Sequence, residues 1–396
     1  MRRILILSVL LALTACIYPY SPELPEQKDL QVLVVSGDII AGEDSYITLR
    51  MVSPLGTPSS ATRANTTDGI VELRNTKGRT AKGGKKVSPG CYLLSTGDLN
   101  PNDRYKVRII WKGHTYETPL MKVQPAPEIT KLDYTVDDSH MNVRISLDGG
   151  ADLTDFRWDF SENWEYHAWF VPDVMFVPGA SSNENPAEMY REPLPTEDYY
   201  YCWNSREGIQ PCVASTSGLS ENLIKDRVFH SIARTDARVS VLYSILVTAR
   251  GVSPECRAYI EYQNSTSNIT GDLFTPVPSH MKGNIRCITD STRLAVGYVE
   301  ATRVTAKRLF VDYAGVYVST VNPYYYLYYP ELDEEENKYH FDDLYAAGDA
   351  PVYVNSEMVP IVPTKTNVQW APKWCSDCRE SGGNKNKPEW WPNNHK

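Results

Sequence analysis

The sequence predicts an all-β protein made of two β-sandwich domains, of the immunoglobulin-like or transthyretin-like kind, with a long insertion and few short helices. Three observations support this class. The chain contains 26 Tyr, 27 Pro and 23 Gly, a composition typical of strands joined by frequent turns. Short runs of alternating apolar and polar residues outnumber helix-period patterns. At 396 residues, the chain is also too long for one ordinary core.

The N-terminus has the pattern of a bacterial lipoprotein signal. Arg2 and Arg3 precede an apolar run from Ile4 to Leu13, and two small residues then lead into Cys16. In such a signal the cysteine thiol is acylated before cleavage, so the mature chain begins at that cysteine and carries enough fatty chains for stable anchoring. We therefore predict a signal peptide over residues 1–15 and a lipid anchor at Cys16.

Residues 16–28 are predicted to be a lipidated tether, because they hold several prolines and no apolar periodicity. The first sandwich is predicted over residues 29–124, where short runs rich in β-branched and aromatic residues alternate with turn residues. Its clearest hairpin has Lys112-Gly113 as a two-residue turn. The runs are Leu30–Ile40, Ser45–Val52, Gly69–Arg74, Gly90–Ser95, Tyr105–Trp111 and His114–Val123.

A larger sandwich is predicted over residues 125–370, because Gln124–Pro127 breaks the pattern and a second set of strand-like runs follows. The stretch of about 172–231, rich in Pro, Asn, Ser and Tyr, is too long for a plain connector and is predicted to be a structured insertion. Residues 371–396 are expected to form a C-terminal tail. The expected strands are Ile129–Val136, His140–Leu147, Asp155–Asp159, Trp164–Val171, Val239–Val247 and Leu294–Val304.

Bulk properties narrow the function classes. A net charge of -9 and a pI near 5.4 argue against non-specific nucleic-acid binding, which needs a basic surface. No run after Leu13 is apolar for long enough to span a bilayer, so we expect no membrane helix beyond the signal. The best helix candidate is Pro254–Gln263, with Ser253 as its N-cap.

The sequence lacks the usual enzyme signatures. It has no His-Glu-x-x-His, Gly-x-Ser-x-Gly or Gly-rich phosphate loop, and its histidines never fall at ligand spacing. We therefore expect a protein that is not an enzyme and uses no cofactor or metal. A pair of carboxylates for glycoside hydrolysis would show only in their separation in space. A hydrolase with a site assembled from distant strands therefore stays as an alternative.

The cysteine pattern indicates disulfides. Of the 8 cysteines, Cys16 is assigned to lipid, which leaves an odd number for pairing. Cys375 and Cys378 form a Cys-x-x-Cys, but nothing predicts the strand-helix-strand setting of a redox dithiol, and no second pair completes a zinc site. A bridge that pins the C-terminal tail fits better. Cys375 with Cys378 is one pairing, and either residue with Cys202 or Cys287 is another.

An aromatic run in the second domain has two interpretations. Trp158 and Phe160 alternate with charged residues, as in a half-buried strand, so we expect them in the core. Trp164 and Trp169 fit that interpretation less well and are kept as candidate contact residues, which could stack on a sugar or a peptide.

The most unusual local composition is a tyrosine-rich segment followed by acidic residues. Successive tyrosines in a strand point to both faces, so some must be exposed, and exposed Tyr is common at interfaces. This segment is our candidate partner surface, against the alternative of a solvated acidic loop after an edge strand. A calcium loop would need a different spacing. The residues are Tyr324, Tyr325, Tyr326, Tyr328 and Tyr329, then Glu331, Asp333, Glu334, Glu335 and Glu336.

Several short motifs recur in one order along the chain. Together with the lipobox and the small N-terminal sandwich, they resemble an uncharacterised lipoprotein family of Bacteroidota. That family is catalogued under a domain of unknown function and is often encoded beside a TonB-dependent receptor. The motifs are Tyr201-Cys202-Trp203, Ser220-Glu221-Asn222, Tyr243–Val247, Gly271–Phe274, Gly283-Asn284-Ile285, Val296-Gly297-Tyr298, Cys375–Arg379 and Lys387–Trp390.

The resemblance covers nearly the whole chain and implies an outer-membrane lipoprotein whose partner is a TonB-dependent receptor or another outer-membrane barrel. It supplies no catalytic residues. The residues after Cys16 lack a short acidic cluster like the one in the surface-export signal of that phylum. Location at the cell surface and location at the periplasmic face therefore both stay as alternatives. Our leading hypothesis is an accessory or ligand-capturing partner of the receptor in nutrient uptake, for a small ligand that the sequence does not name. The alternative is an envelope assembly or scaffold component that binds another protein.

Overall fold

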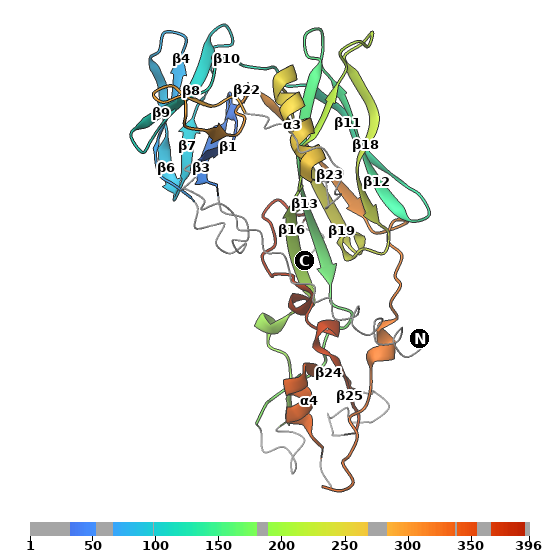
Figure 1. Ribbon diagram of the computed structural model, residues 1–396. Coiled ribbons are helices and arrows are strands. Elements are labelled where there is room, and N and C mark those ends of the chain that lie inside the picture. The colour runs from blue at the N-terminus through green and yellow to red at the C-terminus, as the bar shows by residue number, and fades with distance from the viewer. Residues whose placement is uncertain are drawn as a thin grey trace, which may run out of the picture.

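The computed structural model describes residues 32–52, 66–97, 99–179, 189–267, 283–336, 339–354 and 366–392. The predicted signal peptide, Cys16 and the tether lie outside these residues. The described part consists mainly of strands, with the two helices α3 (Pro254–Ser267) and α4 (Phe341–Ala347), so the predicted all-β class is confirmed. Figure 1 shows two sandwiches side by side, with a smaller module below the second. No helix in the described ranges combines the length and the apolar character needed to cross a membrane.

The first sandwich packs two sheets on a core of alternating residues. One sheet has the order β21-β1-β3-β7-β6 and the other β20-β9-β8-β4-β5, with β10 also pairing β8. Lys112 and Gly113 both have positive φ, at 47° and 76°, as the predicted two-residue hairpin requires. The strands from the N-terminal region are β1 (Leu33–Ser36), β3 (Asp44–Met51), β4 (Ile70–Asn75), β5 (Thr80–Gly83), β6 (Lys85–Ser88), β7 (Cys91–Ser95), β8 (Arg104–Trp111), β9 (His114–Glu117) and β10 (Met121–Lys122).

A segment from much later in the chain completes the first sandwich. β20 (Arg286–Cys287) pairs with β9, and β21 (Ala295–Val296) runs parallel to β1. β22 (Ala301–Thr302) runs parallel to β2 (Ile39–Ile40). Figure 1 shows this orange segment among the blue and cyan strands. The sequence pattern predicts one strand of the second sandwich over Leu294–Val304, where the structure has β21 and β22 paired with the first sandwich. Alternation identifies a strand without identifying its partner.

The second sandwich faces a three-stranded sheet with a longer one. The first has the order β11-β12-β18 and the second β16-β13-β19-β23, with β17 also pairing β13. Buried side chains of both sheets form one hydrophobic core. The strands are β11 (Glu128–Val136), β12 (His140–Asp148), β13 (Asp155–His167), β16 (Tyr201–Glu207), β17 (Cys212–Ser215), β18 (Leu223–Ala233), β19 (Leu242–Gly251) and β23 (Val304–Asp312).

Two features of the second sandwich differ from the predicted pattern. β13 is continuous, although its polar middle suggested two separate strands, because the buried Glu162 there is hydrogen-bonded to His230 of the opposing sheet and to Tyr243 of the neighbouring strand. The stretch of about 172–231 supplies β16, β17 and most of β18 as integral strands. Its turn-rich composition hides these strands in the sequence. α3 begins at the predicted Pro254, and Ser253 Oγ accepts a hydrogen bond from Cys256 N at 3.2 Å as an N-cap should.

The lower module has a small core of its own. It contains β14 (Met175–Phe176), β15 (Tyr190–Arg191), β24 (Asp349–Val354), β25 (Val368–Pro372) and α4. The packed residues are Val174, Phe176, Met189, Tyr190, Phe341, Val368 and Trp370. The module follows β13 at one end and β23 at the other, so it lies below the second sandwich (Figure 1).

The C-terminal tail runs back from the lower module and is fixed to β16. A disulfide joins Cys202 to Cys378, and Trp203 exchanges two backbone hydrogen bonds with Asn384, at 2.8 and 2.9 Å. A Cβ on Gly383 would lie 2.1 Å from the Tyr166 hydroxyl, so only glycine permits this close approach. The tail therefore forms a fixed wall beside β16.

Candidate ligand-binding cavity

A cavity of about 550 Å³ lies at the end of β13, between the second sandwich and the tail. Figure 1 shows β13 and β16 continuing below the opposing sheet toward the lower module. The inner face of these strands therefore meets the tail instead of another sheet. The aromatic lining residues are Trp164, Tyr166, Trp169, Tyr200, Tyr317 and Trp374, and the polar side chains are His167, Asn204, Arg206, Asp236, Arg238, Ser240 and Ser381.

A fully buried carboxylate, Glu162, lies between the hydrophobic core and the cavity. Its Oε1 accepts hydrogen bonds from His230 Nε2 at 2.9 Å, Arg238 Nη1 at 2.8 Å and Tyr243 Oη at 2.9 Å. Burial opposes ionisation, but the hydrogen bond from His230 and the charge of Arg238 outweigh it, so the pKa of Glu162 lies below its ordinary value. Glu162 therefore holds three neighbouring side chains in fixed positions.

The two arginines of the cavity differ in their freedom to bind. Arg238 is fully engaged, because it also donates from Nε and Nη2 to Asp236 at 3.1 and 2.8 Å. Arg206 has only a long ion pair, from Nε to Glu162 Oε2 at 3.7 Å, and its side chain is 45% exposed. The positive charges of Arg206 and Arg238 thus balance the negative charges of Glu162 and Asp236. Of the two guanidinium groups, that of Arg206 is the one available to a ligand.

His167 is held in place by a buried carboxylate. Its Nε2 lies 2.8 Å from Glu165 Oε1, and Glu165 Oε2 accepts from Trp391 Nε1 at 2.8 Å. The imidazole also packs against Tyr200, with ring centroids 4.9 Å apart. Within the described ranges, no hydroxyl or thiol is hydrogen-bonded to His167, so this pair lacks the nucleophile of a hydrolytic triad.

The indole groups divide into two kinds. Trp111, Trp370 and Trp391 each donate to a protein acceptor, at 2.8, 3.2 and 2.8 Å. The indole N–H groups of the cavity residues Trp164, Trp169 and Trp374 have no acceptor among the described residues. The same holds for the indole N–H groups of Trp158 and Trp203, which are deeply buried.

A second, more open hollow of about 620 Å³ shares Arg206 with the cavity. Its walls include Phe160, Phe229 and Ile209, and His230 is its polar contact with the Glu162 cluster. It gathers mostly apolar side chains along the edge of the sandwich and lacks the group of indole donors found in the first cavity. The first cavity is therefore the better candidate site.

The structure places the aromatic candidates as follows. Trp158 is buried in the core and Phe160 packs beside it, whereas Trp164 and Trp169 lie in the cavity wall. Arg206, Arg238, Glu162 and His167 were not identified from the sequence. A signal for one of them existed: Glu162 is a charged residue at an inward position of an aromatic strand, and such a charge is expensive unless it has partners.

The tyrosine-rich segment is not a strand, which corrects the expectation from its sequence. Tyr324 to Tyr326 lie in a 3-10 helix (Pro323–Tyr326) because Pro323 occupies its first turn and Asn322 caps it. Tyr324 and Tyr325 are 69% and 85% exposed. Tyr326 packs its ring 4.9 Å from that of Trp374, so this surface adjoins the cavity.

Of the remaining tyrosines of the segment, Tyr328 packs against the core of the lower module. Tyr328 donates to Asp349 at 2.6 Å and pairs with Trp370 through the backbone, and Tyr329 is partly exposed. We call the exposed residues Tyr324, Tyr325 and Tyr326 the tyrosine patch.

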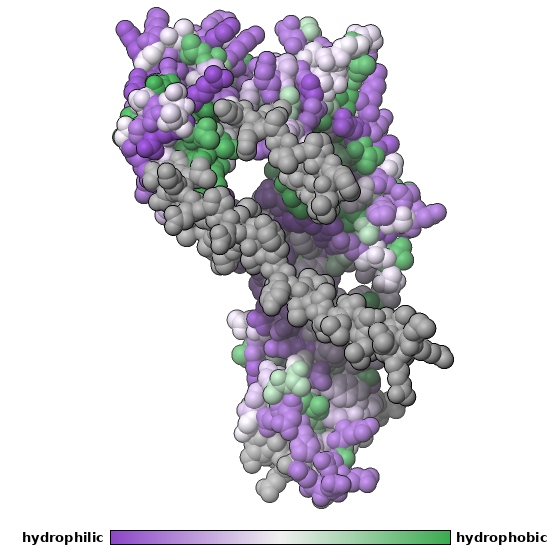
Figure 2. Space-filling view, viewed as in Figure 1, coloured by the Kyte–Doolittle hydropathy of each residue, from purple (hydrophilic) through white to green (hydrophobic). Residues whose placement is uncertain are grey.

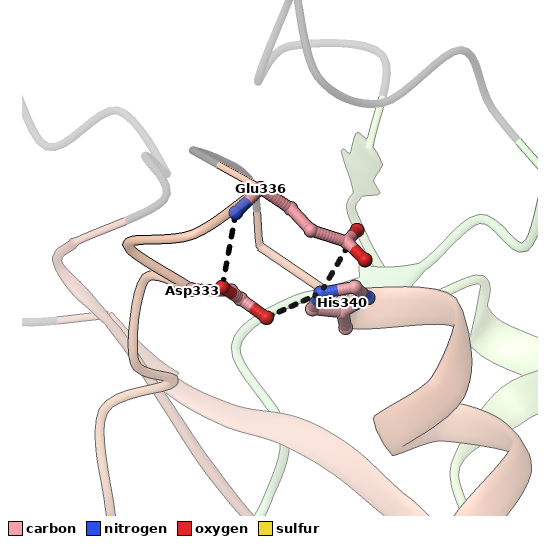
Figure 3. A group of neighbouring side chains, drawn as sticks. All are labelled: Asp333, Glu336 and His340. Atoms are coloured by element: carbon pink, nitrogen blue, oxygen red, sulfur yellow. Dashed lines mark hydrogen bonds and ion pairs between the residues drawn. The ribbon is translucent and has the colours of Figure 1, made fainter.

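An acidic cluster follows the tyrosine patch (Figure 3). The donor atoms of Asp333, Glu336 and His340 lie within 4.8 Å of one another. His340 Nε2 lies 3.4 Å from Asp333 Oδ2, and backbone N–H groups of Glu335 and Glu336 hydrogen-bond to Asp333 and lower its pKa. These contacts account for the cluster as a solvent-exposed turn, so we assign no metal to it.

The cysteines show one bridge in the described part of the chain. Of the pairings that the sequence left open, the structure has Cys202–Cys378. Cys375 is buried as a free thiol, and burial raises its pKa to about 12. Cys287 is also a free thiol and lies in the first sandwich. A thiol with such a raised pKa is a poor nucleophile, so Cys375 is a packing residue.

The chain was compared with known proteins. Residues 17–308 match a family model described as a domain of unknown function, DUF4249. No curated protein matches the chain. Among solved structures, a two fibronectin type-III domain segment from chicken tenascin is similar at 9% identity, over 54% of this chain and 88% of that one, with a TM-score of 0.15.

Proposed function

The chain belongs to this family of unknown function, and from that premise we propose that it is a lipid-anchored outer-membrane lipoprotein that captures a ligand for a TonB-dependent receptor in nutrient uptake. The observation that carries the proposal is the aromatic cavity beside β13, where Trp164, Trp169 and Trp374 meet. Concave sites with aromatic walls and a few fixed polar groups are the usual form of a small-molecule site. Anchoring through Cys16 would keep such a site at the membrane.

The arrangement of charges supports binding over catalysis. Asp236, the carboxylate that lines the cavity, is held by Arg238 through both of its oxygens. Glycoside hydrolysis needs two carboxyl groups facing one substrate. Among the described residues that line the cavity, Asp236 is the single carboxylate, and it is already bound by Arg238. The ionisable groups satisfy one another, so they hold a shape and are not poised to move protons.

The tyrosine patch supports a protein partner. Tyr324 and Tyr325 are the most exposed members, and Tyr326 links the patch to Trp374 of the cavity wall. Tyrosine supplies large contact area at low entropic cost and is enriched at interfaces. A receptor that contacts this patch would lie next to the cavity, where the ligand is handed over. Figure 2 shows a face that is largely hydrophilic where residues are described, with hydrophobic groups on both sandwiches.

A scaffold role in envelope assembly is the second candidate. The observation that favours it is again the tyrosine patch, because a protein-binding surface serves assembly as well as uptake. The two roles differ in their use of the cavity. Only an uptake partner needs a small ligand to occupy it.

The test is an affinity pull-down of the tagged, lipidated protein from native membranes in mild detergent, with bound proteins identified by mass spectrometry. We expect a TonB-dependent receptor in stoichiometric amount. The double variant Y324S/Y325S should lose the receptor, whereas the matched variant Tyr313→Ser, which is exposed outside the patch, should retain it. Recovery of assembly proteins without a receptor would favour the scaffold role. Recovery of the lipoprotein alone would contradict both.

A further inference from the structure

We propose that the cavity binds a neutral saccharide, with sugar rings stacked on its tryptophans and sugar hydroxyls accepting from its unpartnered donors. This inference names the ligand class of the proposed uptake function and rests on that function only for its biological purpose. Saccharide binding itself is a property of the isolated chain. The proposal rests on the aromatic faces, the donor groups, the charge balance and the rigidity of the site.

The aromatic faces come from separate parts of the chain. Trp164 and Trp169 lie at the end of β13, and Trp374 comes from the tail. Aromatic rings attract positively polarised C–H groups to their faces, and a pyranose ring presents such groups on its flat sides. Trp169 is 37% exposed, and Trp164 and Trp374 are partly buried, the latter beside Tyr326.

The donor groups of the cavity need acceptors. Indole N–H and guanidinium groups are donors only. The three indoles and the terminal nitrogens of Arg206 have no hydrogen-bond acceptor in the described part of the chain. A hydrocarbon ligand would leave these groups without partners, which costs binding energy. A ligand with many oxygen acceptors on a largely apolar ring satisfies both the faces and the donors, and a sugar is such a molecule.

The charge balance selects a neutral ligand. Arg206 and Arg238 are offset by Glu162 and Asp236, three of them joined by hydrogen bonds of 2.8 to 3.1 Å. A phosphate or dicarboxylate would therefore meet the carboxylate of Asp236 in the wall, with that of Glu162 buried behind it, as well as the one available guanidinium. Sites built for strong anions concentrate cations instead.

The site is also prepared before binding. The Cys202–Cys378 disulfide and the backbone bonds of Asn384 fix the tail against β16, and Glu162 fixes Arg238. Pre-organisation lowers the entropic cost of binding. A volume of about 550 Å³ lies within the usual range of small-molecule sites, so a short saccharide fits.

The experiment uses the purified soluble chain with Cys16→Ala. Titration calorimetry and tryptophan fluorescence measure binding of maltotriose, cellotriose, xylotriose and mannotriose, with trigalacturonic acid, ATP and riboflavin as charged and planar aromatic comparators. We expect at least one neutral trisaccharide to bind and to quench fluorescence. Trp169→Ala and Trp374→Ala should each weaken that binding roughly tenfold. Trp390→Ala is the matched control, because Trp390 is 44% exposed and lies outside the cavity.

Each outcome decides the proposal. If no neutral saccharide binds, if a comparator binds in preference, or if neither cavity variant alters the affinity, the saccharide assignment is overturned. Trp169→Ala answers the question even if Trp374→Ala unfolds, because Trp169 is a partly exposed side chain. Saccharide binding without a receptor in the pull-down would uphold this inference and contradict the uptake role. A receptor without saccharide binding would do the reverse.

Discussion

The two ends of β13 place the same kind of residue in opposite situations. Trp158 and Trp164 lie on the same face of one strand, three alternations apart. Trp158 is fully buried in the core between the two sheets, whereas Trp164 is partly buried at the edge of that core and lines the cavity together with residues of the tail. The difference teaches that alternation determines the face of a strand, and the element opposite determines whether an aromatic residue is core or site.

The largest effect should come from removing the buried member of the pair. Trp158→Ala should lower the free energy of unfolding by about 3–5 kcal/mol, because it leaves a cavity in a closed core. Urea unfolding of the Cys16→Ala chain, followed by circular dichroism, measures this loss. Saccharide binding by the folded fraction should be unchanged. A fall in the free energy of unfolding of less than about 1 kcal/mol would show that Trp158 is not enclosed in a packed core.

The next effect tests the boundary between the two ends. Glu162→Gln keeps the size of the side chain but removes the charge that satisfies Arg238 and His230, so we expect a loss of about 2–3 kcal/mol. Because the folded pKa of Glu162 is lowered, its charge stabilises the protein above the unfolded pKa, near 4.5, and this contribution is lost as pH falls through the folded pKa.

The pH dependence gives that prediction its control. Stability curves of both proteins between pH 7 and pH 3 should converge toward acid, because protonated glutamate and glutamine are both neutral. Parallel curves would show that the pKa of Glu162 is the same in the folded and unfolded states. The exposed variant Glu221→Gln should leave the curve unchanged, since this residue has only a long surface ion pair.

Opening the tail wall should have a comparable effect on stability and a larger one on binding. The double variant C202S/C378S removes the disulfide and should cost about 2–4 kcal/mol at most, and less where the hydrogen bonds of the tail persist. Saccharide affinity should fall because the wall loses its fixed position. Cys375→Ser, a neighbouring buried thiol without a bridge, tests whether the bond or the local packing matters. Equal affinities of C202S/C378S and wild type would show that the tail is held without the disulfide.

The smallest stability effect belongs to the exposed member of the comparison. Trp169→Ala should change the free energy of unfolding by less than about 1 kcal/mol, because surface substitutions rarely cost more. It should nevertheless weaken ligand binding. Trp158→Ala would then lose stability but not binding, and Trp169→Ala would lose binding but little stability. Similar losses in both measurements would remove the distinction between the two ends of β13.

Local signals predicted the local structure well. The Lys112-Gly113 turn and the start of α3 at Pro254 follow from dihedral and capping preferences that nearby residues determine. The core position of Trp158 follows from alternation. The tyrosine patch was misassigned as strand because runs of Tyr favour strands on average, whereas Pro323 with the Asn322 cap favours a turn of helix.

Signals that depend on distant partners were beyond the sequence. The cavity is lined by the end of β13, the region of β16, the loop at Asp236, Tyr317 and the tail, which are five separate parts of the chain. No periodicity records which of them meet. The choice of Cys202 as the partner of Cys378 has the same origin, because it depends on the tail lying along β16.

The return of residues 283–302 to the first sandwich affects how the protein is made. The first sandwich lacks β20 and β21 at its edges until β11 to β19, which precede them in the chain, have been synthesised. During that interval its β1 and β9 edges are unpaired, and unpaired edges invite aggregation. The nascent chain therefore carries its earliest domain unfinished until residue 302 has been synthesised.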